Sequence, residues 1–552
     1  MPCMAAPGFG SLAALAPRST RSNTCKLNLP AFSCLRGPIL MRSCWYPTAP
    51  LTGRIEPISL MPPAAPIYMD YAASAPVDPR VAERMSALLL AGPHANPSAR
   101  HEGGIEAGKL IAESAAQVGA LVGLSGEEVI FTSGATESIG LGVIGAARYR
   151  SRQGRHVITG LSEHPAGLKS CLALRNEGFE VTCLEPDSRG VVTSEALRSV
   201  LRPDTVLVSL MHVNNEIGVV QDVAEFGRLC AEHGAWLHVD AAQSAGKLPL
   251  NMRRQRIDLL SLTAHKMYGP KGAGALCINR ERIPRIEPLL FGGGQQRSLR
   301  PGTLPTHQVA GLGAACEMAG RDMEAEGLRV SALRERLWQG LSKAGGVMLN
   351  GAGADLAPGI LSVSVEDVEG SSLVDALEGI VFSLGSACSR AQDEPSAVLR
   401  CLGRSPLLAG STIRFSVGRF STEQEIDRVS GIFQRAVASL RALSDEQPAL
   451  GEGPGCITRG EAGRRNAGDW IRLEARWNRD EVVETAFRVL GPPILAAAAR
   501  NGAAALKSSG RRLAVDEWTA RLNEELKPPP EARSLLLCAR DALQACLRGE
   551  DN

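Results

Sequence analysis

Lys266 is the last residue of the segment Ser261–Lys266, S-L-T-A-H-K, which begins at the end of an apolar run. The Gly/Pro-rich segment Met267–Gly272 comes next. The apolar run Ile257–Leu262 is typical of a buried strand. Burial disfavours the charged form of an amine, so a lysine at the end of such a strand loses its proton readily. A neutral lysine amine can form a Schiff base with an aldehyde cofactor such as pyridoxal phosphate (PLP). Lys266 is therefore a candidate catalytic residue, and a solvated surface lysine is the alternative.

Two further segments have the residue types that such a cofactor needs. Phe131–Ser138, F-T-S-G-A-T-E-S, is a strand followed by a Gly-containing turn that opens a helix. The free N–H groups of that turn can bind a phosphate, although a plain helix cap looks similar. Asp240 ends the apolar strand Trp236–Val239. A buried carboxylate needs a cationic partner, for which a pyridinium nitrogen is suitable, and a helix N-cap is the alternative.

A histidine and a pair of amides follow two other predicted strands. His164 stands in S-E-H-P, and Asn214 and Asn215 stand in M-H-V-N-N-E-I-G. Each of these segments is also compatible with an ordinary polar turn. Because all of these side chains follow predicted parallel strands, and α/β sheets bind ligands at the carboxyl ends of their strands, we expect them to share one site.

Short β-rich runs alternate with helical stretches from about residue 66 to 310, which predicts a mostly parallel sheet covered on both faces. A long helix is expected over 311–345, and shorter strands and helices over 358–440 indicate a smaller α+β domain. Asp445–Gly455 reads as a linker, and a hairpin (471–477 and 482–490) and helices from Ile494, Val515 and Ser534 follow it. The predicted strands of the large sheet contain Val129–Phe131, His156–Ile158, Val206–Val208, Trp236–Val239 and Leu259–Ser261.

Composition excludes several classes of protein. The net charge of +2 gives no case for nucleic acid, and no apolar run approaches the roughly 20 residues that span a bilayer. The 14 cysteines include no C-x-x-C pair, which argues against a zinc ribbon and for a reducing compartment. Residues 1–60 hold six basic residues and one acidic residue, as in a transit peptide, or else they reflect a start assigned too early, before Met61. We therefore expect a cytoplasmic protein, or one of the mitochondrial matrix if 1–60 is a transit peptide.

Residues 66–444 resemble the NifS/IscS-type cysteine desulfurases, which are PLP enzymes of the class V aminotransferase family. The resemblance rests on motifs that occur in the family's order: F-T-S-G-A-T-E-S, S-E-H, M-H-V-N-N-E-I-G-V-V-Q, H-V-D-A-A-Q-S, A-H-K-M-Y-G-P-K-G, R-P-G-T-L-P-T-H-Q and S-L-G-S-A-C-S-R-A. It implies the type I fold of PLP-dependent transferases, with a large domain at 61–310 and a long helix and small domain at 311–444.

The resemblance also assigns roles around the cofactor. Lys266 would be the Schiff-base lysine, Asp240 would pair with the pyridinium nitrogen, Gln243 would meet the ring hydroxyl, and His164 would stack on the ring and move protons. The residues that would hold the phosphate are Ala135, Thr136, Thr263, His265 and, in the other subunit of a homodimer, Thr303.

The same resemblance assigns the substrate and the nucleophile. Asn215 and Arg414 match positions that orient the carboxylate of L-cysteine, and an arginine fork suits a carboxylate. Cys388 lies among Gly, Ser and Ala residues in S-L-G-S-A-C-S-R-A, where an exposed thiol is plausible. Its thiolate would attack the substrate sulfur, release alanine and carry a persulfide to acceptor proteins such as an iron–sulfur scaffold. The alternatives are a selenocysteine lyase-like enzyme and a catalytically silent binding protein of a sulfur pathway.

The segment after the linker (445–458) resembles an IscU-type iron–sulfur scaffold over 459–552. The positions of the cluster-ligand cysteines hold Ala467, Pro492 and Leu535, which cannot ligate iron. Cys538 and Cys546 remain on a predicted helix, where we interpret them as core residues. We therefore expect a degenerate scaffold domain without a metal site, which serves either as an interaction module or as a structural cap.

Overall fold

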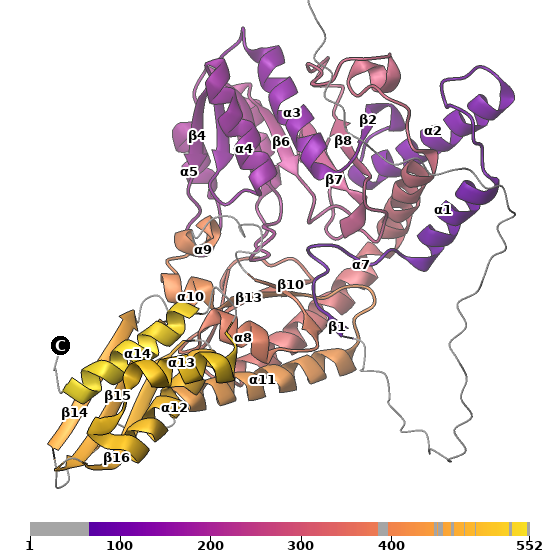
Figure 1. Cartoon of the computed structure of the whole chain (residues 1–552). Helices are drawn as coiled ribbons and strands as arrows, with labels where there is room; N and C mark the ends of the chain where they lie inside the picture. The colour runs from indigo at the N-terminus through magenta and orange to yellow at the C-terminus, as the bar shows by residue number, and fades with distance from the viewer. Residues whose placement is uncertain are drawn as a thin grey trace, which may run out of the picture. The chain divides into compact units, whose positions relative to one another are not determined.

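Figure 1 shows a computed structural model of the chain. The structure describes residues 66–384, 396–445, 450, 456–464, 469–479, 481–491, 493–528 and 533–548. Below, residues 66–445 are called the cavity-bearing region and residues 456–548 the C-terminal region. No helix in the described part of the chain is both long enough and apolar enough to cross a membrane.

A seven-stranded sheet forms the centre of the cavity-bearing region. Its strands are β2 (Val129–Thr132), β3 (His156–Gly160), β4 (Glu180–Leu184), β5 (Thr205–Met211), β6 (Trp236–Asp240), β7 (Leu259–Thr263) and β8 (Gly274–Ile278). The order across the sheet is β2-β8-β7-β6-β5-β3-β4, and only β8 runs antiparallel to its neighbours. The expected mostly parallel α/β fold is therefore confirmed. The strands β4 and β8 were not predicted.

Alternating side chains along the strands pack into two apolar cores, one on each face of the sheet. Along β7, Leu260 and Leu262 belong to one core and Leu259 belongs to the other. Strands that are apolar on both faces require cover on both faces. The helices α3 (Ala135–Arg150) and α4 (Pro165–Ala173) cover one side (Figure 1), whereas α2 (Glu102–Val122) and α6 (Val223–His233) contribute to the core on the other.

One polar side chain crosses the middle of the sheet. His238 of β6 is fully buried, and its two ring nitrogens hydrogen-bond the Ser209 hydroxyl of β5 and the Ser261 hydroxyl of β7, both at 2.9 Å. Burial lowers the pKa of this histidine to about 3. The imidazole is therefore neutral near pH 7 and links three adjacent strands.

The long helix α7 (Thr306–Ser342) leads from the central sheet to a second sheet. That sheet is four-stranded and antiparallel, in the order β12-β13-β10-β9. It packs with α7 and α11 (Glu423–Asp445) around its own apolar core. The helix begins five residues earlier than the predicted 311. The bounds of the strands are β9 (Val347–Leu349), β10 (Ile360–Val365), β12 (Ser383–Leu384) and β13 (Thr412–Ser416).

The C-terminal region is an antiparallel sheet of three strands followed by helices. The predicted hairpin is present as β15 (Asp469–Asn478) and β16 (Glu481–Leu490), and β14 (Cys456–Arg464) pairs with β15 at its other edge. Part of β14 falls within the segment that was predicted as linker. The Ser372 hydroxyl of α8 (Gly370–Ala376) donates to the Gly491 carbonyl oxygen at 3.2 Å, a contact with the cavity-bearing region. The helices are α12 (Pro493–Ser509), α13 (Val515–Leu526) and α14 (Arg533–Arg548).

Candidate functional site

A cavity of about 670 Å³ opens where β6 and β7 end and α3 begins. Ten of the twelve residues expected at the site line it. They come from segments that lie far apart in the sequence; the parallel strands bring nine of them to one edge of the central sheet, and Arg414 comes from β13 of the second sheet. They are Ala135, Thr136, His164, Asn215, Asp240, Gln243, Thr263, His265, Lys266 and Arg414.

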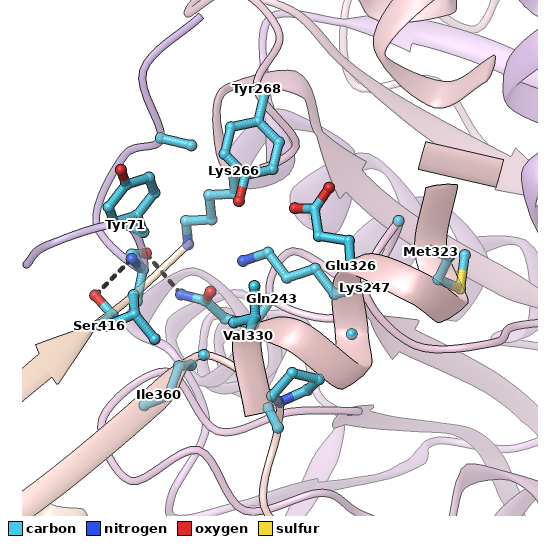
Figure 2. Close-up of a pocket in the computed structure, with 18 residues that line it drawn as sticks. Tyr71, Gln243, Lys247, Lys266, Tyr268, Met323, Glu326, Val330, Ile360 and Ser416 are labelled. Carbon is cyan, nitrogen blue, oxygen red and sulfur yellow. Dashed lines mark hydrogen bonds between the residues drawn. The ribbon is translucent and has the colours of Figure 1, made fainter. Parts of the chain in front are cut away.

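Lys266 lies between this cavity and a second, smaller one. It ends a single 3-10 turn that directly follows β7. Figure 2 shows the second cavity, where the Lys266 and Lys247 side chains lie near Tyr268 and Glu326. Burial and the charge of Lys266 lower the pKa of Lys247 to about 8. Lys266, the lysine that the sequence indicated, thus lies in partly buried surroundings.

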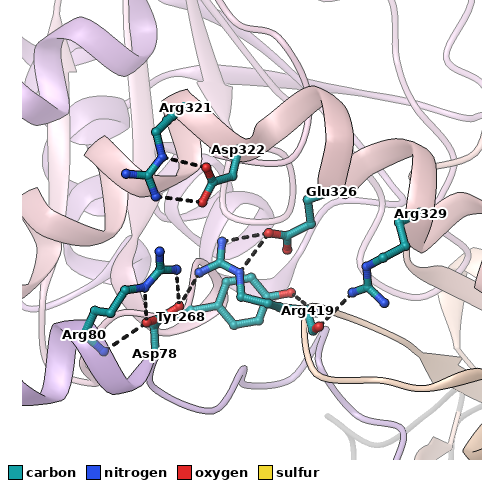
Figure 3. A network of polar contacts seen from close by, with 8 residues as sticks. All are labelled: Asp78, Arg80, Tyr268, Arg321, Asp322, Glu326, Arg329 and Arg419. Atoms are coloured by element: carbon teal, nitrogen blue, oxygen red, sulfur yellow. Dashed lines mark hydrogen bonds and ion pairs between the residues drawn. The ribbon is translucent and has the colours of Figure 1, made fainter.

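A network of charges anchors the loop after Lys266 (Figure 3). Tyr268 has a φ of 61°, which is strained for a residue with a side chain. Its hydroxyl accepts from the Arg419 backbone N–H at 2.7 Å, and the Arg419 guanidinium lies 4.2 Å from its ring centre. Arg419 also pairs with Asp78 at 2.6 Å and with Glu326 at 2.7 Å. The network connects the lysine loop to helix α7 and to the second sheet's domain.

Asp240 and Gln243 lie on one wall of the main cavity. Asp240, at the end of β6, is buried, and its Oδ1 accepts from the Ala242 N–H at 2.9 Å. The expected alternative, a cap on a helix, does not hold, because Ala242 and the residues after it form a turn. Gln243 donates from Nε2 to the Ala72 carbonyl oxygen at 2.8 Å, while its Oε1 is buried without a partner in the described structure. Both side chains therefore offer acceptor oxygens for a ligand.

His164 enters the cavity from the N-terminus of α4. Its Nδ1 accepts from the Ala166 N–H at 3.1 Å, which leaves Nε2 to hold the proton of the neutral ring. Burial lowers the pKa of His164. The charge of Asp240 opposes this shift, and the charge of Lys266 adds to it. The preceding Glu163 is buried, and burial followed by the charge of Asp240 raises its pKa well above the usual range. In its neutral form, His164 is thus suited to stack on a ligand or to donate from Nε2.

The opposite end of the cavity is suited to an anion. The first N–H groups of α3 have no partners within the helix, and Ala135 and Thr136 form this end of it. The start of β8 packs closely here, since a Cβ on Gly274 would lie 2.6 Å from the Gly134 Cα. Beside them, burial and then Lys266 lower the pKa of His265 to about 4. Helix N–H groups and hydroxyls are the donors that bind phosphate.

Arg414 and Asn215 form a third wall. Arg414 is buried in β13, and its Nη1 donates to the Asn215 carbonyl oxygen at 2.7 Å. The neighbouring Asn214, in contrast, is structural, because its side chain accepts from the N–H groups of Glu216 and Ile217. Of the two amides that the sequence offered, Asn215 alone lines the cavity.

Two expected residues are not placed in the cavity. Thr303 is exposed, in the loop before α7, and does not line it. Cys388 lies outside the described residues. Among the described residues, no group of three or more His, Cys, Asp or Glu is arranged to hold a metal ion.

Several lining residues were missed by the sequence reasoning. Burial raises the pKa of Glu216, next to the chosen Asn215, to about 7, and its Oε2 accepts from the Ser396 hydroxyl at 2.5 Å. Asp70, in M-D-Y, pairs with Arg414 at 2.9 Å. The strand-end argument finds only residues that follow strands of the large sheet. Asp70 lies behind Arg414 and is not itself a lining residue; the missed lining residues also include Ala72, Ala73, Ser74, Lys271 and Ser383.

The donor set fits PLP. The helix N–H groups and hydroxyls at one end can bind the phosphate of PLP. The Asp240 carboxylate can bind its protonated ring nitrogen, and the Gln243 amide can bind its phenolic oxygen. The unpartnered Gln243 Oε1 marks a polar group that is not satisfied within the protein, which is typical of a binding site. The Lys266 amine can form a Schiff base with the aldehyde of PLP.

Comparisons with known proteins agree with this geometry. The model of the family "Aminotransferase class-V" matches residues 67–429. The cysteine desulfurase IscS of Salmonella arizonae is 49% identical over 381 residues, which cover 69% of this chain and 94% of that protein. Among solved structures, a NifS-like protein (33% identical, TM-score 0.63) covers 68% of this chain and 100% of its own. SspA in complex with cysteine (34% identical, TM-score 0.58) covers 64% and 100%. The chain therefore belongs to the class-V aminotransferase family, among its IscS- and NifS-like cysteine desulfurases.

Proposed function

We propose that the protein is a PLP-dependent cysteine desulfurase, which converts L-cysteine to L-alanine and retains the sulfur as a persulfide on Cys388. The observation that carries this proposal is the cavity in which Lys266, Asp240 and Arg414 meet. These side chains supply an amine for an aldehyde cofactor, a partner for its ring nitrogen and a cation for an amino-acid carboxylate. The 49% identity to proteins named cysteine desulfurase IscS supports the choice of reaction.

The residues that would hold PLP follow from the donor set. Lys266 would bind its aldehyde, Asp240 its ring nitrogen and Gln243 its ring hydroxyl. The bound cofactor would supply an electron sink that acidifies the α-proton of the amino acid. The phosphate would lie at the start of α3, against Ala135, Thr136, Thr263 and His265, and Thr303 would reach the phosphate of the other subunit of a homodimer.

Three side chains would act on the substrate itself. Arg414 and Asn215 bind and orient the α-carboxylate, which fixes the α-proton relative to Lys266. The Lys266 amine removes that proton as a general base. His164 would stack on the cofactor ring in its neutral form, because its pKa is lowered, and the proton that it holds at Nε2 is the one that it would move.

Cys388 completes the reaction. Its thiolate attacks the substrate sulfur, so that an S–S bond forms and the bond from Cβ to sulfur breaks. The electron pair of the broken bond stays with the substrate carbon, which takes up a proton and leaves as the methyl group of alanine. In balance, cysteine and the Cys388 thiol give alanine and the Cys388 persulfide, without an external oxidant or reductant.

The persulfide would pass to acceptor proteins such as an iron–sulfur scaffold, in the cytoplasm or, if residues 1–60 are a transit peptide, in the mitochondrial matrix. The C-terminal region would be a degenerate IscU-like module that docks on the desulfurase. Two of the positions where the scaffold family has cysteines, Ala467 and Pro492, lie outside the described residues, and Leu535 packs against the apolar core of α14. Cys546 is fully buried and Cys538 partly buried in that core.

The test measures sulfide and alanine released from L-cysteine by the wild type and by Cys388→Ser. We expect stoichiometric alanine and sulfide from the wild type with a reductant present, and a loss of both in Cys388→Ser. Unchanged turnover in Cys388→Ser would contradict the persulfide and favour a selenocysteine lyase-like enzyme, which needs no thiol there. Lys266→Ala should lose the visible absorbance of bound PLP, with the exposed Lys169→Ala as the control that keeps it. A wild type without that absorbance would favour the silent binding protein.

A further inference from the structure

The protein itself engages most of the Arg414 guanidinium. Nη1 donates to the Asn215 carbonyl oxygen, while Nη2 donates to Asp70 Oδ1 at 2.9 Å and to Ser383 Oγ at 2.8 Å. Nε is buried, and among the described residues it has no hydrogen-bond partner. For an added ligand, the guanidinium therefore offers the Nε hydrogen and one hydrogen of Nη1.

These two free hydrogens do not lie on one edge of the guanidinium. An arginine grips a carboxylate with two parallel N–H groups, either from Nε and Nη2 or from Nη1 and Nη2, because the Cδ methylene closes the third edge. Both usable edges include Nη2, which Asp70 and Ser383 contact from one side, since their oxygens lie 2.8 Å apart. A carboxylate from solution that binds Arg414 in this way must share Nη2 with Asp70 and Ser383 or displace one of them.

Asp70 is the stronger of the two contacts because it is charged. The Arg414 and Asp70 side chains are 10% and 15% exposed, so water screens their attraction only weakly. The Ser383 hydroxyl also donates to Asp70 Oδ1 at 2.8 Å, which fixes the carboxylate against the guanidinium. Arg414 and Ser383 both line the main cavity, so a ligand there can contact the guanidinium that Asp70 holds.

We propose that Asp70 is a positioning residue that holds Arg414 in a neutral pair and competes with the α-carboxylate of the substrate for Nη2. When the substrate carboxylate takes an Nη2 hydrogen, Asp70 keeps the hydrogen bond from Ser383. A thiol without a carboxylate does not compete with Asp70, so its binding does not depend on the pair, whereas the pair lowers the affinity for a thiol that carries a carboxylate. The inference rests on the proposed function only for the identity of the substrate.

The experiment compares Asp70→Asn with the wild type as full-length, PLP-loaded protein. Asparagine keeps the shape and an acceptor oxygen but removes the charge. The probes are 3-mercaptopropionate and 3-mercaptopropionamide, which differ only in the carboxylate, and calorimetry measures their binding. We expect the Kd of the carboxylate to fall about tenfold, which corresponds to ~1.4 kcal/mol, and that of the amide to stay the same. The KM for L-cysteine should fall without a proportional rise in kcat.

Ser383→Ala is the second variant, and the exposed Asp375→Asn is the control, which should bind both probes like the wild type. Ser383→Ala removes one acceptor from Nη2 without changing the charge, so we expect a smaller gain in carboxylate binding. If Asp70→Asn does not fold, the Ser383→Ala variant decides the test. Unchanged or weaker carboxylate binding in the folded variants overturns the competition. Tighter binding in a protein that releases no alanine would keep this inference and refute the proposed function.

Discussion

The cavity-bearing region and the C-terminal region are both built from sheets and helices, but they use the ends of their strands differently. In the first, parallel strands end at one edge, where a carboxylate, a lysine and a histidine meet around about 670 Å³ of space. In the second, β14, β15 and β16 are antiparallel, so successive strands end at opposite edges. A parallel sheet therefore gathers chemistry from distant segments, whereas an antiparallel hairpin sheet does not.

The interiors differ as well. The cavity-bearing region buries many ionic and polar groups, such as Asp78, Glu163 and His238. The C-terminal region has an apolar core with Cys546, and its described buried polar residues are Glu474, Arg476 and Thr519. All nine histidines of the chain lie between residues 94 and 307, so the C-terminal region contains none. We expect charge and pH to affect the stability of the first region more than that of the second.

Arg419→Met should give the largest effect, a loss of about 3 kcal/mol in the stability of the cavity-bearing region, because it leaves Glu326 and Asp78 without this partner. The matched change is Arg472→Met in β15, whose pair with Glu461 is more exposed and should contribute about 0–1 kcal/mol. Denaturant unfolding, followed region by region through hydrogen exchange, measures both. Equal losses would remove the contrast between the two regions.

His238→Asn should change the pH dependence of stability by about 2 kcal/mol between pH 7.5 and 5. The pKa of His238 falls from 6.5 in the unfolded chain to about 3 in the folded one. Below pH 6.5 the unfolded chain therefore binds a proton that the folded chain does not, and the wild type loses stability as the pH falls. The variant should be less stable at pH 7.5 but should lose less on acidification. Parallel curves for the two proteins would show that the buried ring does not titrate in this way.

Cys546→Ala should have the smallest effect, a loss of about 1 kcal/mol confined to the C-terminal region, since it removes one sulfur from an apolar core. Turnover of L-cysteine should be unchanged, and so should the iron content after reconstitution. Cys456→Ala, at an exposed position of β14, is the control for the stability change. A loss of turnover or of bound iron in Cys546→Ala would mean that this thiol takes part in chemistry.

The strands and helices were predictable where periodicity was long and clear, as for β5, β6, β7 and α6. The polar ends of the parallel strands also indicated cavity residues such as Lys266, Asp240 and His164, whereas the family resemblance supplied others, such as Gln243 and Arg414. Asp70 was not predictable in this way, since its pairing with Arg414 joins residues 344 apart in the sequence. The strand β14 was not predicted, and its first residues were assigned to the linker, because a Gly/Pro-rich segment precedes it and its own residues alternate weakly.

The contact between the Ser372 hydroxyl and the Gly491 carbonyl oxygen joins two parts of a single chain. Its occupancy therefore does not change on dilution, unlike that of a complex between separate proteins. A short tether holds its partner at an effective concentration on the order of millimolar. A free protein that docks at this place must outcompete that local concentration.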